Sequence, residues 1–438
     1  MLQSPKIDCS LASFAHLHQH VPPTYIKPVS TKSLAVKQTH FLCLPPRSPG
    51  AYSAPPNDQI IHLDQIRCPE RSIVEQNLLR LPEDDTEQLM EALRHFKYAH
   101  LLRIAAQEVT GRLPLMRVSD QLTYVAEAVV GQVKNLAWRE ISERHGHPQN
   151  EHGSSDDFIV VGYGKVGGWE LSYGSDLDLV FIYDMPSHLE TDGPKPVANS
   201  VFFTRLGQRM INYLNTVTAA GQLFEVDMRL RPDGAKGLLV STLVAFNQYQ
   251  LNEAWTWEHQ ALVRARPIAG SDKLCDDFIA VRKQVLCQPR QPDELKQQVI
   301  AMRKKMRQQL ASKPNADGST SQFHLKHDEG GIVDIEFMVQ YGVLAYAHQC
   351  HNLLTYTDNI RILDGFERQN ILSASQAQDL REAYEIMRAA EHRLTLQNQA
   401  GEVSSYDLQE QRQKVMAIWA TMMAGEWSYN DLSGGCLL

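Results

Sequence analysis

A glycine-rich turn, Gly164–Gly168, has the residue types that can hold the phosphates of a nucleotide. It follows the apolar run Phe158–Val161 and precedes Trp169. Glycines at a strand-to-helix turn let the backbone approach a ligand closely and present N–H groups to an anion. A Walker loop is excluded, because Gly-Lys-Ser/Thr does not follow at the required spacing. The alternative is that the glycines serve only a tight turn.

Two carboxylates at the start of the next predicted strand could hold a metal ion. Asp176 and Asp178 alternate with Leu177, Leu179 and Phe181. Residues two apart on a strand share a face, so the two carboxylates are expected side by side. Adjacent anions repel each other, whereas Mg²⁺ is held by one or two carboxylates together with substrate phosphates. A solvated strand end that carries two acids is the alternative.

A third carboxylate comes from a later segment. The alternation over residues 223–231 predicts a strand with Glu225, Asp227, Arg229 and Arg231 on one face. Asp227 is the candidate third metal ligand of a phosphoryl-transfer site, and the two arginines are candidate phosphate clamps. Glu225 could replace Asp227, and an exposed ladder of salt bridges is the alternative.

The elements that must position these residues are strands and helices in alternation between about 157 and 285. The continuous apolar run 158–161 predicts a buried strand, and apolar residues at helical spacing predict a helix over 199–215. Two further helices are expected upstream, one from Pro82 and one capped by Ser119. Downstream the chain is predicted to be mostly helical, over residues 293–311, 333–350, 358–370 and 374–399.

The composition excludes several classes of protein. Acidic residues number 51 against 43 basic ones, a formal charge of −8, which argues against binding nucleic acid with the whole surface. The sequence has neither an apolar run long enough to cross a membrane nor a secretory signal, so a cytoplasmic location is expected. The seven cysteines form no Cys-x-x-Cys pair, which favours reduced thiols.

The N-terminal end differs from the rest of the chain. Ten of the 21 prolines lie in the first 69 residues, so residues 1–70 are predicted to be a disordered extension or sequence unrelated to the working protein. His16, His18 and His20 could bind a metal adventitiously, but a disordered polar segment without a binding role is favoured.

The order of these motifs resembles the signature of the DNA-polymerase-β-like nucleotidyltransferases. That signature is an apolar residue with Gly-Gly, a spacer, Asp-apolar-Asp, and a carboxylate on a later strand. The likeness extends to one family, the glutamine-synthetase adenylyltransferases, over about residues 75–420. The segments that carry it are Gly162–Leu171, Tyr173–Asp178, Val226–Pro232 and Asp328–Phe337.

The resemblance implies a fold and a division of the chain. The fold is α+β, a polymerase-β-like nucleotidyltransferase domain with a mixed sheet between N-terminal helices and a C-terminal helical bundle. The expected divisions are an extension (1–70), a helical lead-in (71–150), the catalytic domain (151–288), the helical domain (289–423) and an atypical tail (424–438).

The resemblance also implies an activity. Full-length family members are bifunctional: one half removes AMP from glutamine synthetase by phosphorolysis, and the other attaches AMP from ATP to a tyrosine. Trp169–Leu171 and Glu253–Leu262 look like the adenylylating half. The alternatives are the AMP-removing activity, a nucleotidyltransferase that acts on another protein or a small molecule, or a non-catalytic fragment that binds glutamine synthetase or the P-II signal protein.

Roles carried over from the family stay expectations. Asp176, Asp178 and Asp227 would hold Mg²⁺, two ions in all, and Asp227 could also accept the tyrosine proton. The residues expected to hold ATP are Lys165, Gly167, Gly168, Ser175, Arg229 and Arg231. Lys165 could instead be a surface lysine, and the roles of Glu225, Asp334 and Glu336 stay open. The expected partner is glutamine synthetase, with P-II and glutamine as regulators, and neither nucleic acid nor membrane.

Overall fold

The computed structural model describes residues 85–312 and 322–424. Four sequence predictions lie outside the described residues: the extension over 1–70, the histidines 16, 18 and 20, nearly all of the tail from 424, and four of the seven cysteines. The described cysteines, Cys275, Cys287 and Cys350, are free thiols.

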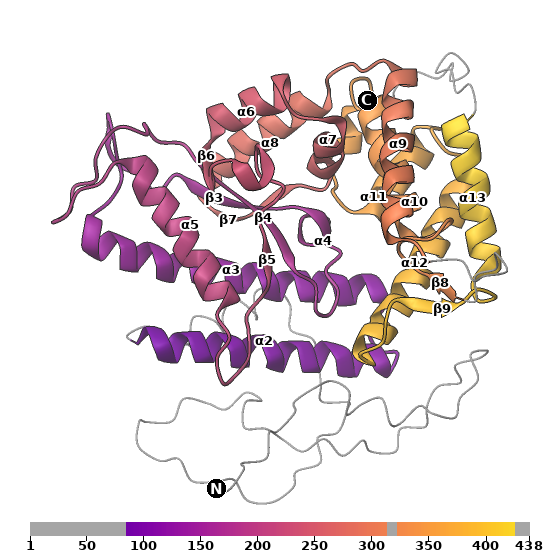
Figure 1. Cartoon of the computed structure of the whole chain (residues 1–438), viewed down its shortest axis with the longest axis horizontal. Coiled ribbons are helices and arrows are strands. Elements are labelled where there is room, and N and C mark those ends of the chain that lie inside the picture. The colour runs from indigo at the N-terminus through magenta and orange to yellow at the C-terminus, as the bar shows by residue number, and fades with distance from the viewer. Residues whose placement is uncertain (1–84, 313–321, 425–438) are drawn as a thin grey trace, which may run out of the picture.

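A mixed sheet lies at the centre of the molecule (Figure 1). Its strands run in the order β5-β4-β3-β7, and β6 extends the same edge of β4 as β5. The pairs of β3 with β4 and with β7 are antiparallel, whereas β4 is parallel to β5 and β6. The strand bounds are β3 Phe158–Gly162, β4 Leu177–Tyr183, β5 Val226–Asp227, β6 Val240–Thr242 and β7 Arg266–Gly270. The predicted α+β fold with a mixed sheet is confirmed.

The two faces of the sheet belong to two different hydrophobic cores. Ile159 and Val180 lie in the core that continues into the C-terminal helices. Val160 and Phe181 lie in the core shared with the N-terminal helices. Because side chains alternate along a strand, the fully buried β3 must be apolar at every position, which is why its run is continuous.

The N-terminal helices and α5 cover one face of the sheet. Their bounds are α2 Thr86–Val109, α3 Leu115–His145 and α5 Asn199–Asn215, and two short strands, β1 Gln149–Asn150 and β2 Gly153–Ser154, follow α3. The predicted helix over 199–215 is confirmed. The predicted cap at Ser119 is wrong: α3 begins after Pro114, whose φ of −64° and ψ of 150° are extended, and Ser119 is buried within the helix.

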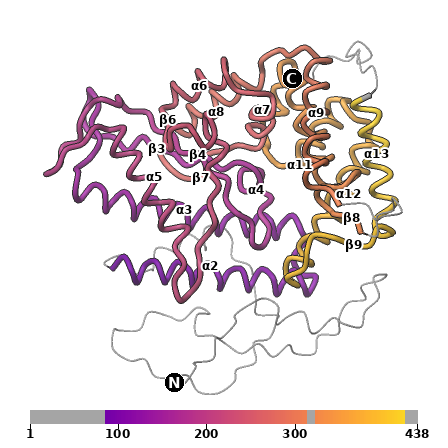
Figure 2. The backbone as a smooth tube through the Cα atoms, in the orientation of Figure 1, coloured from indigo at the N-terminus to yellow at the C-terminus, as the bar shows by residue number. Residues whose placement is uncertain are grey.

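The C-terminal helices form a bundle at one end of the molecule, as the tube in Figure 2 shows. The bundle bounds are α9 Pro292–Leu310, α10 Ile332–Tyr346, α11 Asn359–Arg368, α12 Ala374–Leu396 and α13 Gln409–Ala424, with β8 Gln322–His324 paired to β9 Glu402–Ser404. Four of these helices confirm the predicted ones to within a few residues. No specific prediction covers α13, nor α6 Leu243–Asn252, α7 Thr256–Val263 and α8 Asp272–Leu286, of which α6 and α8 contact the sheet.

The predicted strand over 223–231 is wrong except near its middle, because the only strand there, β5, contains two residues, Val226 and Asp227. The chain turns directly after Asp227, whose Oδ1 accepts a hydrogen bond from the backbone N–H of Arg229 at 2.8 Å. A second turn follows, in which the N–H of Arg231 donates to the carbonyl of Met228 at 3.3 Å. Side-chain capping of the backbone competes with strand pairing, so the arginines leave the predicted strand face.

In the described part of the chain, no helix is both long enough and apolar enough to cross a membrane.

Phe203 on α5 gives a test of the packing between α5 and the sheet. Its ring stacks on Tyr183 and Phe158, with centroid distances of 4.4 and 5.9 Å, and is fully buried. We expect Phe203→Ala to lower the free energy of unfolding by about 3–5 kcal/mol. Val201 lies on the same helix and is 40% exposed, so Val201→Ala should change the free energy of unfolding by less than about 0.5 kcal/mol. Urea denaturation of both variants measures the difference, and equal effects would contradict this packing.

Candidate functional site

The two carboxylates on neighbouring strands lie side by side. Asp178 of β4 pairs in parallel register with Asp227 of β5, so the two side chains share a face of the sheet. Asp176 directly precedes β4, two residues from Asp178, and its charge acts on the same group. Val180 lies two residues from Asp178 on β4 and belongs to the core that continues into the C-terminal helices, so Asp178 shares that face of the sheet. The structure therefore brings together the three predicted carboxylates.

Asp178 has the most perturbed carboxyl of the three. Burial, and then the charges of Asp176 and Asp227, raise its pKa to about 6. Gly164 of the turn lies against it: a Cβ at Gly164 would sit 2.3 Å from Oδ2 of Asp178, and its φ of +54° also favours glycine. This glycine is therefore needed for close approach of the turn to the carboxylate.

Asp227 is neutralised by its neighbour in the chain. The guanidinium of Arg229 donates to both carboxylate oxygens, with Nη2 2.5 Å from Oδ2. These hydrogen bonds hold the pKa of Asp227 below its usual range. Within residues 85–312 and 322–424, no group of three or more His, Cys, Asp or Glu side chains is arranged closely enough to hold a metal ion. In this arrangement the carboxylate of Asp227 is occupied by Arg229.

The glycine turn forms the short helix α4, Gly164–Gly167, directly after β3. The N–H groups of Gly167 and Gly168 donate to the carbonyls of Tyr163 and Gly164 at 2.9 and 3.0 Å. Both N–H groups therefore close the turn itself and do not point freely at an anion. This arrangement agrees with the tight-turn alternative; the predicted role of both glycines in binding ATP stays a prediction.

The other predicted phosphate ligands already have partners in the protein. Ser175 Oγ accepts from the N–H of Ser172 at 3.2 Å and lies 2.8 Å from its Oγ. Lys165 Nζ donates to Ser172 Oγ at 2.9 Å and pairs with Glu391 of α12 at 3.1 Å. Arg231 donates to three backbone carbonyls of the turn that follows β5. Their roles in nucleotide binding stay predictions.

The ion pair between Lys165 and Glu391 joins the turn to the bundle. Burial lowers the pKa of Lys165, although the charge of Glu391 opposes this. Burial would raise the pKa of Glu391, but the charges of Lys165 and Arg388 outweigh it and lower that pKa to about 2. Lys165 is thus a structural contact to α12 and not the surface lysine of the alternative hypothesis.

Glu225, Asp334 and Glu336, whose roles the sequence left open, have different surroundings. Glu225 comes directly before β5, and its backbone carbonyl accepts from the N–H of Leu177 at 2.9 Å. Asp334 is buried in an ion pair with Arg303 at 2.5 Å. Glu336 pairs with Arg264 at 2.7 Å, close to the glycine turn. Asp334 therefore stabilises the bundle, whereas Glu336 faces the site.

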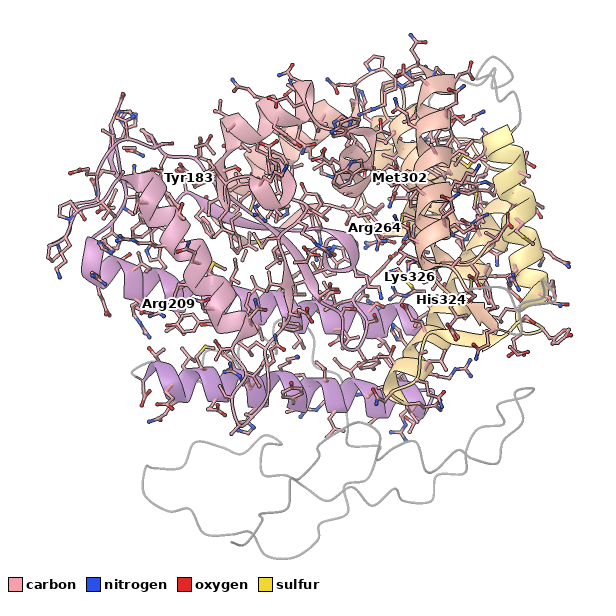
Figure 3. All side chains as sticks on the ribbon, viewed as in Figure 1. Tyr183, Arg209, Arg264, Met302, His324 and Lys326 are labelled. Atoms are coloured by element: carbon pink, nitrogen blue, oxygen red, sulfur yellow. The ribbon has the colours of Figure 1, made fainter. Side chains whose placement is uncertain are left out.

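Lys326 is a candidate site residue that sequence reasoning missed. It lies between β8 and α10, and Figure 3 labels it near Arg264, where the bundle meets the sheet. In the described residues its ammonium forms no ion pair, yet its charge acts on Asp178, Glu336 and Glu391. The sequence feature that could have identified Lys326 is its position two residues before the Asp328–Phe337 motif.

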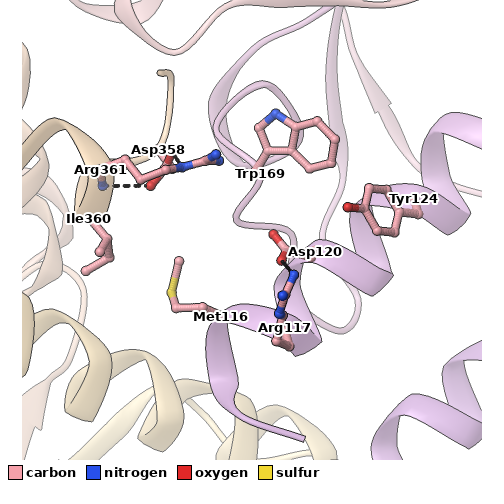
Figure 4. A pocket seen from close by; sticks show the side chains of 8 residues that line it. All are labelled: Met116, Arg117, Asp120, Tyr124, Trp169, Asp358, Ile360 and Arg361. Atoms are coloured by element: carbon pink, nitrogen blue, oxygen red, sulfur yellow. Dashed lines mark hydrogen bonds and ion pairs between the residues drawn. The ribbon is translucent and has the colours of Figure 1, made fainter. Parts of the chain in front are cut away.

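A pocket of about 350 Å³ opens behind the glycine turn, next to Trp169 (Figure 4). Its lining mixes two aromatic rings, two Asp–Arg pairs and two apolar side chains: Met116, Arg117, Asp120, Tyr124, Trp169, Asp358, Ile360 and Arg361. The three aspartates of the site are not among them. Trp169 has a φ of +56°, and Arg266 lies 3.9 Å from its ring centroid.

Two family models match the chain. Residues 59–280 match the model described as glutamate-ammonia ligase adenylyltransferase, and residues 300–418 match the one described as GlnD PII-uridylyltransferase. The first match contains the glycine turn and all three aspartates, and the second contains Lys326 and most of the bundle.

Similar curated proteins carry one name, bifunctional glutamine synthetase adenylyltransferase/adenylyl-removing enzyme. The protein of Pseudomonas aeruginosa is 54% identical over 80% of this chain and 37% of its own length. The protein of Pseudomonas syringae pv. tomato is 55% identical over 79% of this chain and 36% of its own length. The protein of Hahella chejuensis is 48% identical over 84% of this chain and 39% of its own length. The chain therefore spans less than two fifths of the length of these relatives. With the matched residues covering the turn, the aspartates and the sheet that aligns them, the chain belongs to the glutamate-ammonia ligase adenylyltransferase family of nucleotidyltransferases.

Proposed function

We propose that this chain transfers AMP from ATP to a tyrosine of glutamine synthetase in a cytoplasmic, Mg²⁺-dependent reaction that regulates nitrogen assimilation. The observation that carries the proposal is the in-register pair Asp178 and Asp227, with Asp176 beside them, on the sheet face next to the glycine turn. The relatives' name supports glutamine synthetase as the substrate.

The proposed chemistry is a displacement at the α-phosphorus of ATP. The tyrosine oxygen forms a bond to that phosphorus, the bond to the β-phosphate oxygen breaks, and pyrophosphate leaves. Asp227 stays the candidate acceptor for the tyrosine proton, and it can take up that role only when Arg229, which lowers its pKa, has left it.

Three aspartates fit a divalent ion by the chemistry of their donors. Mg²⁺ prefers oxygen ligands, and a cation would remove the repulsion that raises the pKa of Asp178. When bound, Mg²⁺ would stabilise negative charge on the attacking and leaving oxygens. Arg229, 80% exposed at its side chain, could then turn from Asp227 to a phosphate.

The divisions of the chain follow the same proposal. Residues 151–288 would form the catalytic domain and residues 289–423 the helical domain, with the lead-in over 71–150. The match of residues 300–418 to a PII-uridylyltransferase model supports P-II, and with it glutamine, as regulators that act through the helical domain.

Labelled AMP transfer tests the function. The chain, incubated with Mg²⁺, ATP labelled at the α-phosphate and glutamine synthetase, should label a tyrosine of the synthetase. Asp176→Asn and Asp178→Asn should each slow labelling by more than about 100-fold, because both would be metal ligands. Asp156 is exposed and precedes β3, so Asp156→Asn is the matched control and should retain the rate.

Two outcomes would contradict this function. Phosphate-dependent release of AMP from modified synthetase, without labelling, would identify the AMP-removing activity instead. Regulation of the synthetase that survives both aspartate substitutions would favour a non-catalytic binding fragment.

Asp178→Asn also tests the electrostatics of the site through stability. The folded pKa of about 6 lies above the usual 3.8, so the wild-type side chain destabilises the fold once pH rises through 6. Without Mg²⁺, the variant should be more stable than wild type by roughly 1–3 kcal/mol at pH 7–8 and equal to it near pH 4. Urea denaturation across this pH range in a chelator measures the difference. A variant less stable at pH 8 would show that Asp178 is not repelled by its neighbours.

Lys326 should attract the phosphates of ATP from the bundle side of the site. We expect Lys326→Met to weaken binding of a fluorescent ATP analogue about tenfold and to reduce its salt dependence, since one nearby charge is lost. Lys304 on α9 is exposed, so Lys304→Met makes the same charge change on the surface and should leave affinity nearly unchanged. Equal effects of the two substitutions would show that Lys326 acts only through net charge.

A further inference from the structure

One buried arginine contacts both the glycine turn and the helical bundle. Arg264, directly after α7, is 4% exposed at its side chain. Its Nη2 pairs with Glu170, which follows the turn, and its Nη1 pairs with Glu336 of α10 at 2.7 Å. Burial alone would lower the pKa of Arg264, but the two carboxylates outweigh burial and raise it. The guanidinium therefore stays charged between the turn and the bundle.

The guanidinium of Arg264 also fixes the space available to the turn. A Cβ on Gly168 would lie 2.4 Å from Nη2 and 2.7 Å from Nε of Arg264, so this glycine packs directly on the guanidinium plane. Nε is buried and has no hydrogen-bond partner in the described residues. The two carboxylates hold the guanidinium where Gly168 packs against it, and Nη2, which pairs with Glu170, is also the atom nearest to that Cβ position.

Glu170 is held by two further helices of the bundle. Its Oε1 accepts from the backbone N–H of Asn359 on α11 at 2.8 Å, and its Oε2 accepts from Tyr384 Oη on α12 at 2.5 Å. Arg388 of α12 donates to the backbone carbonyl of Glu170 at 2.8 Å. Glu170 and Arg264 therefore link the packing of α10, α11 and α12 to the turn, beside the Lys165–Glu391 pair and the hydrogen bond that Thr357 Oγ1 donates to the carbonyl of Gly167 at 2.7 Å.

We propose that Arg264 is a positioning residue for nucleotide binding, which makes the shape of the Gly164–Gly168 turn depend on the packing of the helical bundle. The inference rests on the proposed role of the turn in binding ATP. Arg264 contacts Gly168 of the turn as well as its two carboxylate partners, so its position affects the turn as well as stability. Any ligand or protein that shifts the bundle would then alter ATP affinity without contacting ATP.

Arg264→Lys is the main test variant. Lysine keeps the charge but cannot reach both carboxylates with a flat, forked group. We expect the Kd for a fluorescent ATP analogue with Mg²⁺ to rise at least about tenfold, since small displacements of a binding group are costly. In AMP transfer, the KM for ATP should rise while the KM for glutamine synthetase changes by less than about twofold.

Arg94→Lys is the matched control. Arg94 is also fully buried and donates to the carbonyls of Met90, Thr216 and Gly221, away from the turn. Arg94→Lys should lower the melting temperature as Arg264→Lys does, but it should leave the affinity for ATP unchanged. An Arg264→Lys variant with wild-type affinity, or equal losses of affinity in both variants, would overturn the inference.

A double-mutant cycle gives a readout that a stabilising role would not produce. Gly168→Ala alone should weaken ATP binding, because its methyl group meets the guanidinium. Lysine lacks those atoms, so adding Gly168→Ala to Arg264→Lys should cause little further loss. Additive losses would overturn the inference.

Failure of the proposed function is distinguishable from failure of this inference. If wild type binds Mg·ATP and Arg264→Lys weakens it, the inference holds even when glutamine synthetase is not labelled. If the wild-type chain binds no Mg·ATP, the result contradicts both the proposed function and the inference about Arg264.

Discussion

The buried contact of Arg264 with Glu170 and Glu336 is the interaction on which the geometry of the site depends. Charges that leave water must be compensated, and removing one member of such a group destabilises a protein by about 3–5 kcal/mol. Here compensation is complete only when the glycine turn and the bundle are both in place, because the two carboxylates come from different parts of the chain. Asn359 and Tyr384 satisfy the remaining oxygen positions of Glu170. The network therefore favours one relative placement of turn and bundle over its alternatives.

The electrostatics of the aspartates also involve residues from several parts of the chain. Val180 and Ile182 lie in the core that continues into the C-terminal helices, and Asp178 shares their face of the sheet. Burial is the largest cause of the raised pKa of Asp178, ahead of the charges of Asp176 and Asp227. The charges of Lys326, which precedes α10, and of Arg264 act in the opposite direction and lower that pKa. The cations that connect the bundle to the site therefore also moderate the repulsion among the carboxylates.

Local patterns in the sequence were sufficient to predict β3, β4 and α5, because the period of apolar residues decides these elements. The prediction failed where a side chain competes with the backbone: Asp227 caps the N–H of Arg229, and the strand ends there. The three aspartates could be grouped from their motif, since strand register brings Asp178 to Asp227. Arg264 and Lys326 could not be placed in the site, because their contacts join segments that are far apart in the sequence and show no periodicity.

The basic side chains near the site form two groups that differ in how far their charges are already held by other residues. Lys165, Arg231 and Arg264 are engaged with Glu391, with backbone carbonyls, and with Glu170 and Glu336, so they shape the protein. Lys326 has no ion pair within the described residues, and Arg229, although paired with Asp227, has a largely exposed side chain. On the proposed function, a triphosphate brings several negative charges to three aspartates, so its binding needs cations that can turn toward the phosphates. Exchange of Arg229 from Asp227 to a phosphate would then expose the third carboxylate as the phosphate arrives. The overall charge of −8 says little about the substrate in that case, since a few cations at the site decide what it attracts.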